Sequence, residues 1–89
     1  MTKLFVIEDE KHAENQGEYP SFEAAVTELQ KRMTIPWDQE PNRCPCEAWE
    51  TCGRTYEIVE YDTDIQPWKE LNRKAILNIS ATETSWLLK

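Results

Sequence analysis

An amphipathic repeat in the first half of the chain restricts the fold more than any other feature. Apolar residues recur there at the three- and four-residue spacing of one helix face, with polar and charged residues between them. These apolar residues are Phe22, Ala25, Val26, Leu29 and Met33. Ser21 is suited to cap the first turn, and Pro36 cannot continue a helix. The sequence therefore predicts one helix within residues 21–34.

Four other stretches have the residue pattern of β-strands. Lys3–Ile7 is rich in apolar residues, and Arg54–Asp62 carries apolar side chains on both of its alternating faces. Lys74–Ala81 alternates apolar with polar residues, which is typical of a strand with one face in solvent. Ser85–Leu88 is apolar enough to pack, either as a fourth strand, which we favour, or as a final helical turn.

Three segments interrupt this pattern. Residues 11–19 are polar and contain Gly17, so they are predicted to form a loop. Pro67–Leu71 is predicted to form about one helical turn, because proline is tolerated at the first helical position. Residues 36–53 contain three prolines, three cysteines and no regular period, which predicts a long loop.

These elements together indicate the α+β class. We expect a small antiparallel sheet of three or four strands with one amphipathic helix packed on one face, in the order β-α-β-β with or without a final strand. Eighty-nine residues are the size of one domain, so residues 1–89 are expected to form a single domain. Residues 1–10 lack the pattern of a signal peptide or a membrane span, which predicts a cytoplasmic protein without membrane contact.

The charge of the chain is acidic and uneven. The net charge is −7, and residues 38–64 contain eight acidic residues but only two basic ones. A field of this sign repels nucleic acid and anionic lipid and attracts basic protein surfaces. It argues against direct binding to nucleic acid and favours a basic protein partner. The alternative interpretation is that the charge serves only solubility.

Two tryptophans stand out on either side of this acidic segment. Trp37 and Trp68 each follow a proline, and tryptophan is enriched at the anchor positions of protein interfaces. Burial in the core is the alternative for both side chains. The residues predicted to bind a partner are Trp37, Asp38, Glu40, Glu47, Glu50, Glu60, Asp62, Asp64 and Trp68.

The sequence does not have the residues of a typical catalytic site. A cysteine nucleophile needs a histidine base, and the single histidine, His12, lies in a polar segment far from the cysteines in the chain. The two glycines are too few for a glycine-rich phosphate loop. We therefore predict a binding module and not an enzyme. It would dock on the basic surface of a partner such as a nucleic-acid-binding protein and inhibit it by imitating nucleic-acid charge, as phage-type inhibitors do. The sequence does not indicate an oligomeric state.

The cysteines supply an alternative hypothesis, a zinc- or redox-responsive module. Cys44, Cys46 and Cys52 are close in sequence, but zinc prefers four ligands, and the fourth would have to be His12. A Cys-x-Cys pair with proline between is also a poor zinc-binding turn. Three free thiols, or one disulfide formed on oxidation, fit the sequence as well. We therefore predict neither a bound metal nor a cofactor.

Overall fold

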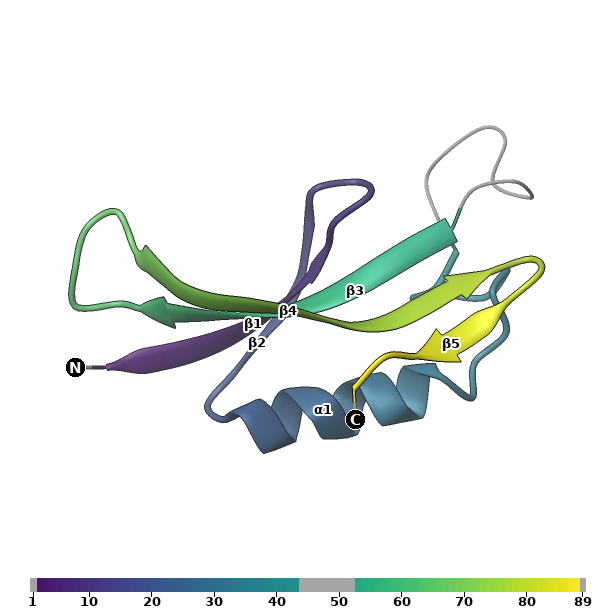
Figure 1. The fold of residues 1–89 in the computed structure, drawn as a ribbon, viewed down its shortest axis with the longest axis horizontal. Helices are drawn as coiled ribbons and strands as arrows, with labels where there is room; N and C mark the ends of the chain where they lie inside the picture. Colours follow the sequence, from purple (N-terminus) through teal and green to yellow (C-terminus); the bar gives the residue numbers. More distant parts are fainter. Residues whose placement is uncertain (1, 44–52, 89) are drawn as a thin grey trace.

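The structure is a computed structural model that describes residues 2–43 and 53–88. In these residues one helix accompanies a five-stranded antiparallel sheet with the strand order β2-β1-β3-β4-β5 (Figure 1). The elements are β1 (Lys3–Asp9), β2 (Glu14–Tyr19), α1 (Phe22–Arg32), β3 (Gly53–Asp62), β4 (Lys69–Ser80) and β5 (Thr84–Trp86). The α+β class predicted from the sequence is confirmed.

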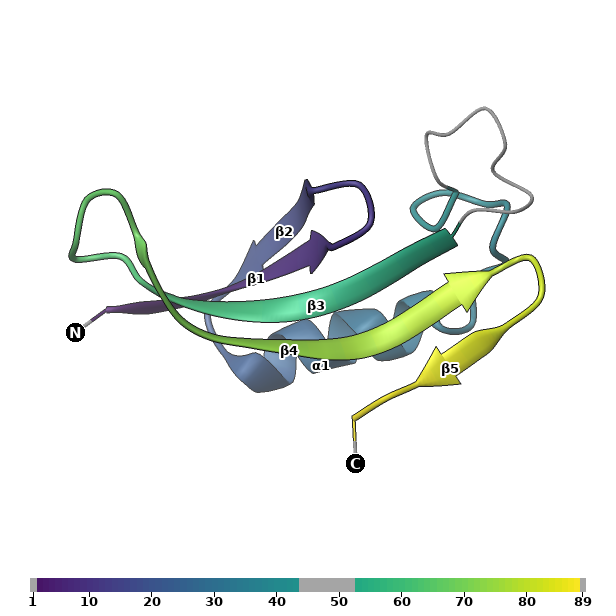
Figure 2. The ribbon, with the colours of Figure 1, turned by 45° about the horizontal axis from the view of Figure 1, so that its top comes forward.

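Helix α1 lies across one face of the sheet, as its apolar spacing predicts (Figures 1 and 2). The N-cap is Ser21, whose Oγ accepts a hydrogen bond from the backbone N–H of Ala24 at 3.1 Å. Ala25 and Leu29 are fully buried in the core, whereas Met33 follows the last helical turn and is exposed. No helix in residues 2–43 and 53–88 is long and apolar enough to cross a membrane.

The two faces of the sheet differ because side chains alternate along each strand. The helix face carries the core, in which Ile7 of β1 lies opposite Ile58 of β3. Val6 and Val59 point to the other side, which we call the open face, and they pair with each other directly. Both are nevertheless buried, so long side chains on the open face must cover them.

Two predictions about the chain order were wrong. Residues 11–19 are not all loop, because Glu14–Tyr19 forms the edge strand β2. The polar composition of this segment gives no strand pattern in the sequence. As an edge strand it contacts the core through Tyr19, which pairs with Phe5. Pro67–Leu71 is not a helical turn, since β4 already begins at Lys69 and pairs with the end of β3. The observed order is β-β-α-β-β-β, so the prediction of a sheet of three or four strands was also wrong, because the polar edge strand β2 adds a fifth. The predicted final strand is confirmed as β5.

Strands β3 and β4 form a long hairpin, and β1 accompanies β3 to its last residue, so the start of the chain lies beside the hairpin turn (Figure 2). The register shifts at two places, between Tyr56 and Glu57 and between Glu60 and Tyr61. Strand β5 pairs with β4 only at Leu77–Ile79. Of the predicted loop at 36–53, residues 36–43 form turns that follow α1, and residues 44–52 lie outside the described part of the chain.

Candidate functional site

The predicted partner-binding residues fall into two groups at opposite ends of the molecule (Figures 1 and 2). One group follows α1 and comprises Trp37, Asp38 and Glu40. The other lies on the β3–β4 hairpin and comprises Glu60, Asp62, Asp64 and Trp68. Glu47 and Glu50 lie outside the described residues. The described members of the predicted set therefore do not form one continuous surface.

The two tryptophans have different environments. Trp37 is partly buried and packs against the hydrophobic core. Trp68 is 39% exposed, and its ring lies beside that of Tyr61 with 5.9 Å between the ring centroids. Of the two side chains, Trp68 has the exposure that a binding anchor needs, and Trp37 contributes to the stability of the fold.

The acidic residues of the hairpin are largely engaged in local contacts. Glu60 pairs with Lys3 at 2.9 Å. The buried Asp62 accepts a hydrogen bond from the backbone N–H of Asp64 at 3.0 Å, which shapes the start of the turn. Asp64 in turn accepts a bond from the backbone N–H of Thr2 at 2.9 Å, and hydrogen bonding to Thr2 lowers the pKa of Asp64. These carboxylates fix the hairpin turn to the start of the chain.

The open face carries an acidic group that the sequence analysis did not identify. Glu8 of β1, Glu57 of β3 and Glu70 of β4 surround Arg73, and we call these three carboxylates the glutamate cluster. The guanidinium nitrogens of Arg73 lie 3.3 Å from Glu8 and 2.9 Å from Glu70, and Arg73 also pairs with Glu57. Hydrogen bonding to Arg73 lowers the pKa of Glu70. One cation thus holds three carboxylates, which leaves an excess of negative charge on this face.

Tyr61 joins this cluster to Trp68. Its hydroxyl donates a hydrogen bond to Glu8 at 2.6 Å, while its ring contacts Trp68. Burial, followed by the hydrogen bond to Glu8 and the charge of Glu8, raises the pKa of Tyr61 to about 12. The open face therefore has ordered carboxylates and an exposed aromatic side chain next to each other.

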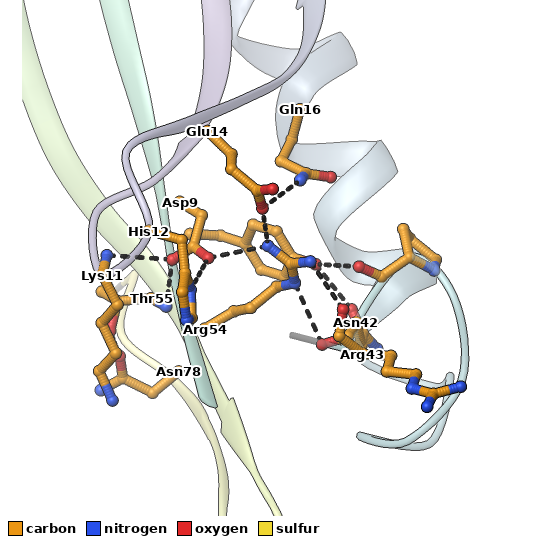
Figure 3. Close-up of polar contacts among 12 residues, drawn as sticks. Asp9, Lys11, His12, Glu14, Gln16, Asn42, Arg43, Arg54, Thr55 and Asn78 are labelled. Carbon is orange, nitrogen blue, oxygen red and sulfur yellow. Dashed lines mark hydrogen bonds and ion pairs between the residues drawn. The ribbon is translucent and has the colours of Figure 1, made fainter. Parts of the chain in front are cut away.

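A second polar network lies buried between the sheet and the segment after α1 (Figure 3). At its centre, the fully buried Asp9 and the guanidinium of Arg54 form an ion pair at 2.8 Å. Asp9 also accepts bonds from the backbone N–H groups of Lys11, at 3.1 Å, and Thr55, at 3.2 Å. Arg54 pairs in addition with Glu14 of β2. The network ties the ends of β1, β2 and β3 together.

The same arginine holds the turns that follow α1. Arg54 donates to the backbone carbonyl oxygens of Asn42 at 3.1 Å and Arg43 at 2.7 Å. Asn42 is buried, donates to the carbonyl oxygen of Arg32 at 2.9 Å and accepts from the Tyr56 hydroxyl at 3.0 Å. No buried side-chain nitrogen or oxygen in residues 2–43 and 53–88 lacks a hydrogen-bond partner. This network is fully satisfied internally, which indicates a structural role.

A signal for this network was present in the sequence. Asp9 is two residues beyond Ile7 and four beyond Phe5, so the period of a strand places it on the core side. An acidic residue in that position requires a buried cation, and Arg54 begins the neighbouring strand. Nothing in one sequence specifies the register that brings the two together.

His12, which the sequence analysis considered as a fourth zinc ligand, takes part in the buried network. Its Nδ1 lies 2.6 Å from the Asp9 carboxylate. The described part of the chain holds no group of three or more histidine, cysteine, aspartate and glutamate side chains arranged to bind a metal. Cys44, Cys46 and Cys52, which carry the alternative zinc or redox hypothesis, lie outside the described residues.

Comparisons with protein-family models, with curated proteins and with solved structures gave no match. Functional inference for this chain rests on the geometry of its own residues.

Proposed function

We propose that this chain is a protein-binding module, not an enzyme, that docks on a basic surface of a partner protein in the cytoplasm. The proposal includes inhibition: by imitating nucleic-acid charge, the module would occupy a surface on which the partner binds nucleic acid. The observation that carries the proposal is the open face, where the glutamate cluster around Arg73 lies beside the exposed Trp68.

The order of the glutamate cluster supports binding to a basic surface. Arg73 restricts the side chains of Glu8, Glu57 and Glu70, so less conformational entropy is lost when a partner cation approaches. The cluster has three carboxylates for one guanidinium, and its field extends over a Debye length of about 8 to 10 Å. Complementary charge of this kind speeds encounter and sets the orientation of the partner.

Apolar side chains at the β3–β4 turn supply the contact area that charge alone does not. The described residues include five exposed large hydrophobic side chains, of which Ile65, Trp68 and Leu71 lie in or beside the β3–β4 turn. Interfaces commonly combine a few aromatic or aliphatic anchors with a polar rim. Trp68 is the expected anchor, and the glutamate cluster is part of the rim.

Photo-crosslinking in the native cells tests the location of the binding surface. A photoreactive residue would replace Gln66, which is exposed in the β3–β4 turn, and in a control protein it would replace Gln30, which is exposed on α1. We expect position 66 to crosslink a protein with a basic surface and position 30 not to do so. Equal crosslinking from both positions, or a partner without a basic surface, would contradict the proposal.

Binding kinetics with the purified partner then separate the two contributions. Raising the salt from about 0.05 to 0.5 M should slow association, because screening shortens the reach of the charges. Trp68→Ala should speed dissociation roughly 30-fold, the equivalent of about 2 kcal/mol for a hot-spot side chain. Leu87→Ala is the matched control, since Leu87 is also 39% exposed but lies after β5, away from the β3–β4 turn. Unchanged dissociation of the Trp68 variant would contradict the proposal, because Trp68 is part of the surface on which it rests.

A further inference from the structure

The outer edge of strand β4 lies beside the glutamate cluster. β5 pairs with β4 only at Leu77–Ile79, and the N–H of Leu87 bonds to the carbonyl oxygen of Ile76 at 2.7 Å. Along Lys69–Ala75, the described residues place β3 on one side of β4 and no strand on the other (Figures 1 and 2). Seven residues of an antiparallel strand span roughly 23 Å. The backbone groups of this edge are available to pair with another chain.

The two faces next to this edge differ in charge. Arg73 pairs with Val59, so it lies on the open face, where the glutamate cluster outnumbers its charge. Lys74 pairs with Ile58 and therefore lies on the helix face, where its side chain is exposed. A strand added at this edge would alternate its side chains between an acidic surface and a surface that carries Lys74.

The charges argue against a second copy of this chain at the edge. Residues 72–75 form the regular stretch between the two register shifts of β4. In a symmetric antiparallel dimer, one residue of β4 lies opposite the same residue of the second copy. If this central residue and both of its neighbours lie within residues 72–75, the central residue is Arg73 or Lys74. Either centre places like charges directly opposite each other, which destabilises the pairing.

We propose that the partner docks by adding an extended segment as a further strand along Lys69–Ala75. Every second residue of this segment would be lysine or arginine, facing the glutamate cluster on the open face. In this mode of recognition, main-chain hydrogen bonds supply affinity, and alternate side chains supply specificity. This inference rests on the proposed function and makes it more specific, because it identifies the partner element as an extended basic segment with a period of two.

Two labelled nonapeptides of equal composition test the period with the full chain. One alternates lysine with threonine, and the other carries the same lysines in a single block. Pairing along the edge lets only the alternating peptide direct all its lysines to the open face, so we expect it to bind roughly tenfold more tightly. Glu70→Gln should weaken that binding several-fold, because Glu70 is the member of the cluster on β4 itself. Glu18→Gln is the matched control, since Glu18 lies on the open face of β2 at the opposite edge of the sheet.

Amide hydrogen exchange locates the added strand. The alternating peptide should slow exchange in residues 71–75 and leave β2 unchanged. Equal affinity for both peptides, or binding without protection of β4, would overturn strand addition. So would concentration-dependent dimers that protect residues 71–75 without peptide, because a second copy would then occupy the edge. If β4 gains no protection while Trp68→Ala still speeds dissociation of the purified partner, strand addition fails and the proposed function stands. If Trp68→Ala also leaves dissociation of the partner unchanged, both strand addition and the proposed function fail.

Discussion

Arg54→Met should destabilise the fold far more than the loss of an average arginine. The guanidinium is buried and has four partners, namely the carboxylates of Asp9 and Glu14 and the backbone carbonyl oxygens of Asn42 and Arg43. Methionine fills much of the same volume but offers no donor. Asp9 would keep its bonds from backbone N–H groups and its contact with His12, and it would lose the guanidinium that compensates its buried charge.

The size of the effect follows from burial. Breaking a buried ion pair by removing one partner costs about 3 to 5 kcal/mol, because the remaining charge is uncompensated. In a domain of this length each kcal/mol lowers the melting temperature by roughly 4 to 8 °C, so the variant should melt about 12 to 40 °C lower. A loss of this size approaches the total stability of many small domains.

Thermal unfolding followed by circular dichroism measures this loss, and Lys3→Met is the matched control. Lys3 also forms an ion pair, with Glu60, but its side chain is 51% exposed. Exposed pairs contribute at most about 1 kcal/mol, so the control should melt within roughly 8 °C of the wild-type protein. If Arg54→Met melts no lower than Lys3→Met, the network does not hold the fold together, and its structural interpretation is wrong.

Three further outcomes follow from single contacts. Trp37→Ala should cost about 3 kcal/mol because the ring packs on the core, whereas Trp68→Ala should cost less than about 1 kcal/mol, and paired melting curves distinguish the two. Gly53→Ala should cost about 1 to 3 kcal/mol, since the new Cβ would lie 2.5 Å from the carbonyl oxygen of Ile79; urea unfolding measures this loss. Tyr61 should titrate near pH 12, above its usual value of 10.0. Its native state then holds a proton that the unfolded chain releases, so its contribution to stability is lost as pH rises between these two values, and ultraviolet absorbance follows the titration.

Local sequence patterns predicted the elements whose side chains themselves determine the structure. The spacing of α1 and its cap at Ser21 specify a helix, and the alternation in Lys74–Ala81 specifies the end of β4 that contacts the core. Strand β2 and the first half of β4 were not predicted as strands. No residue of β2 is fully buried and the first half of β4 is exposed, so their conformation comes from pairing with β1 and β3 and not from their own apolar pattern.

The candidate site was harder to predict, because register and not sequence distance assembles it. Glu8, Glu57 and Glu70 are far apart in the chain, and only Glu57 belongs to the acidic segment 38–64. Pairing of β1 with β3 and of β3 with β4 brings them around Arg73. A count of charges along the sequence cannot contain this information.

The distinction between paired and accessible charge limits what the partner can be. Within the acidic segment, Asp62 is buried and Glu60 is paired with Lys3, so these residues add little to an external field. The glutamate cluster keeps an excess of carboxylates over its one arginine, and it lies on the side of the sheet that α1 leaves open. A partner attracted only by net charge would bind the molecule in many orientations. A partner that needs the open face must match the cluster, Trp68 and the edge of β4 at once, and this combined requirement favours a single docking geometry.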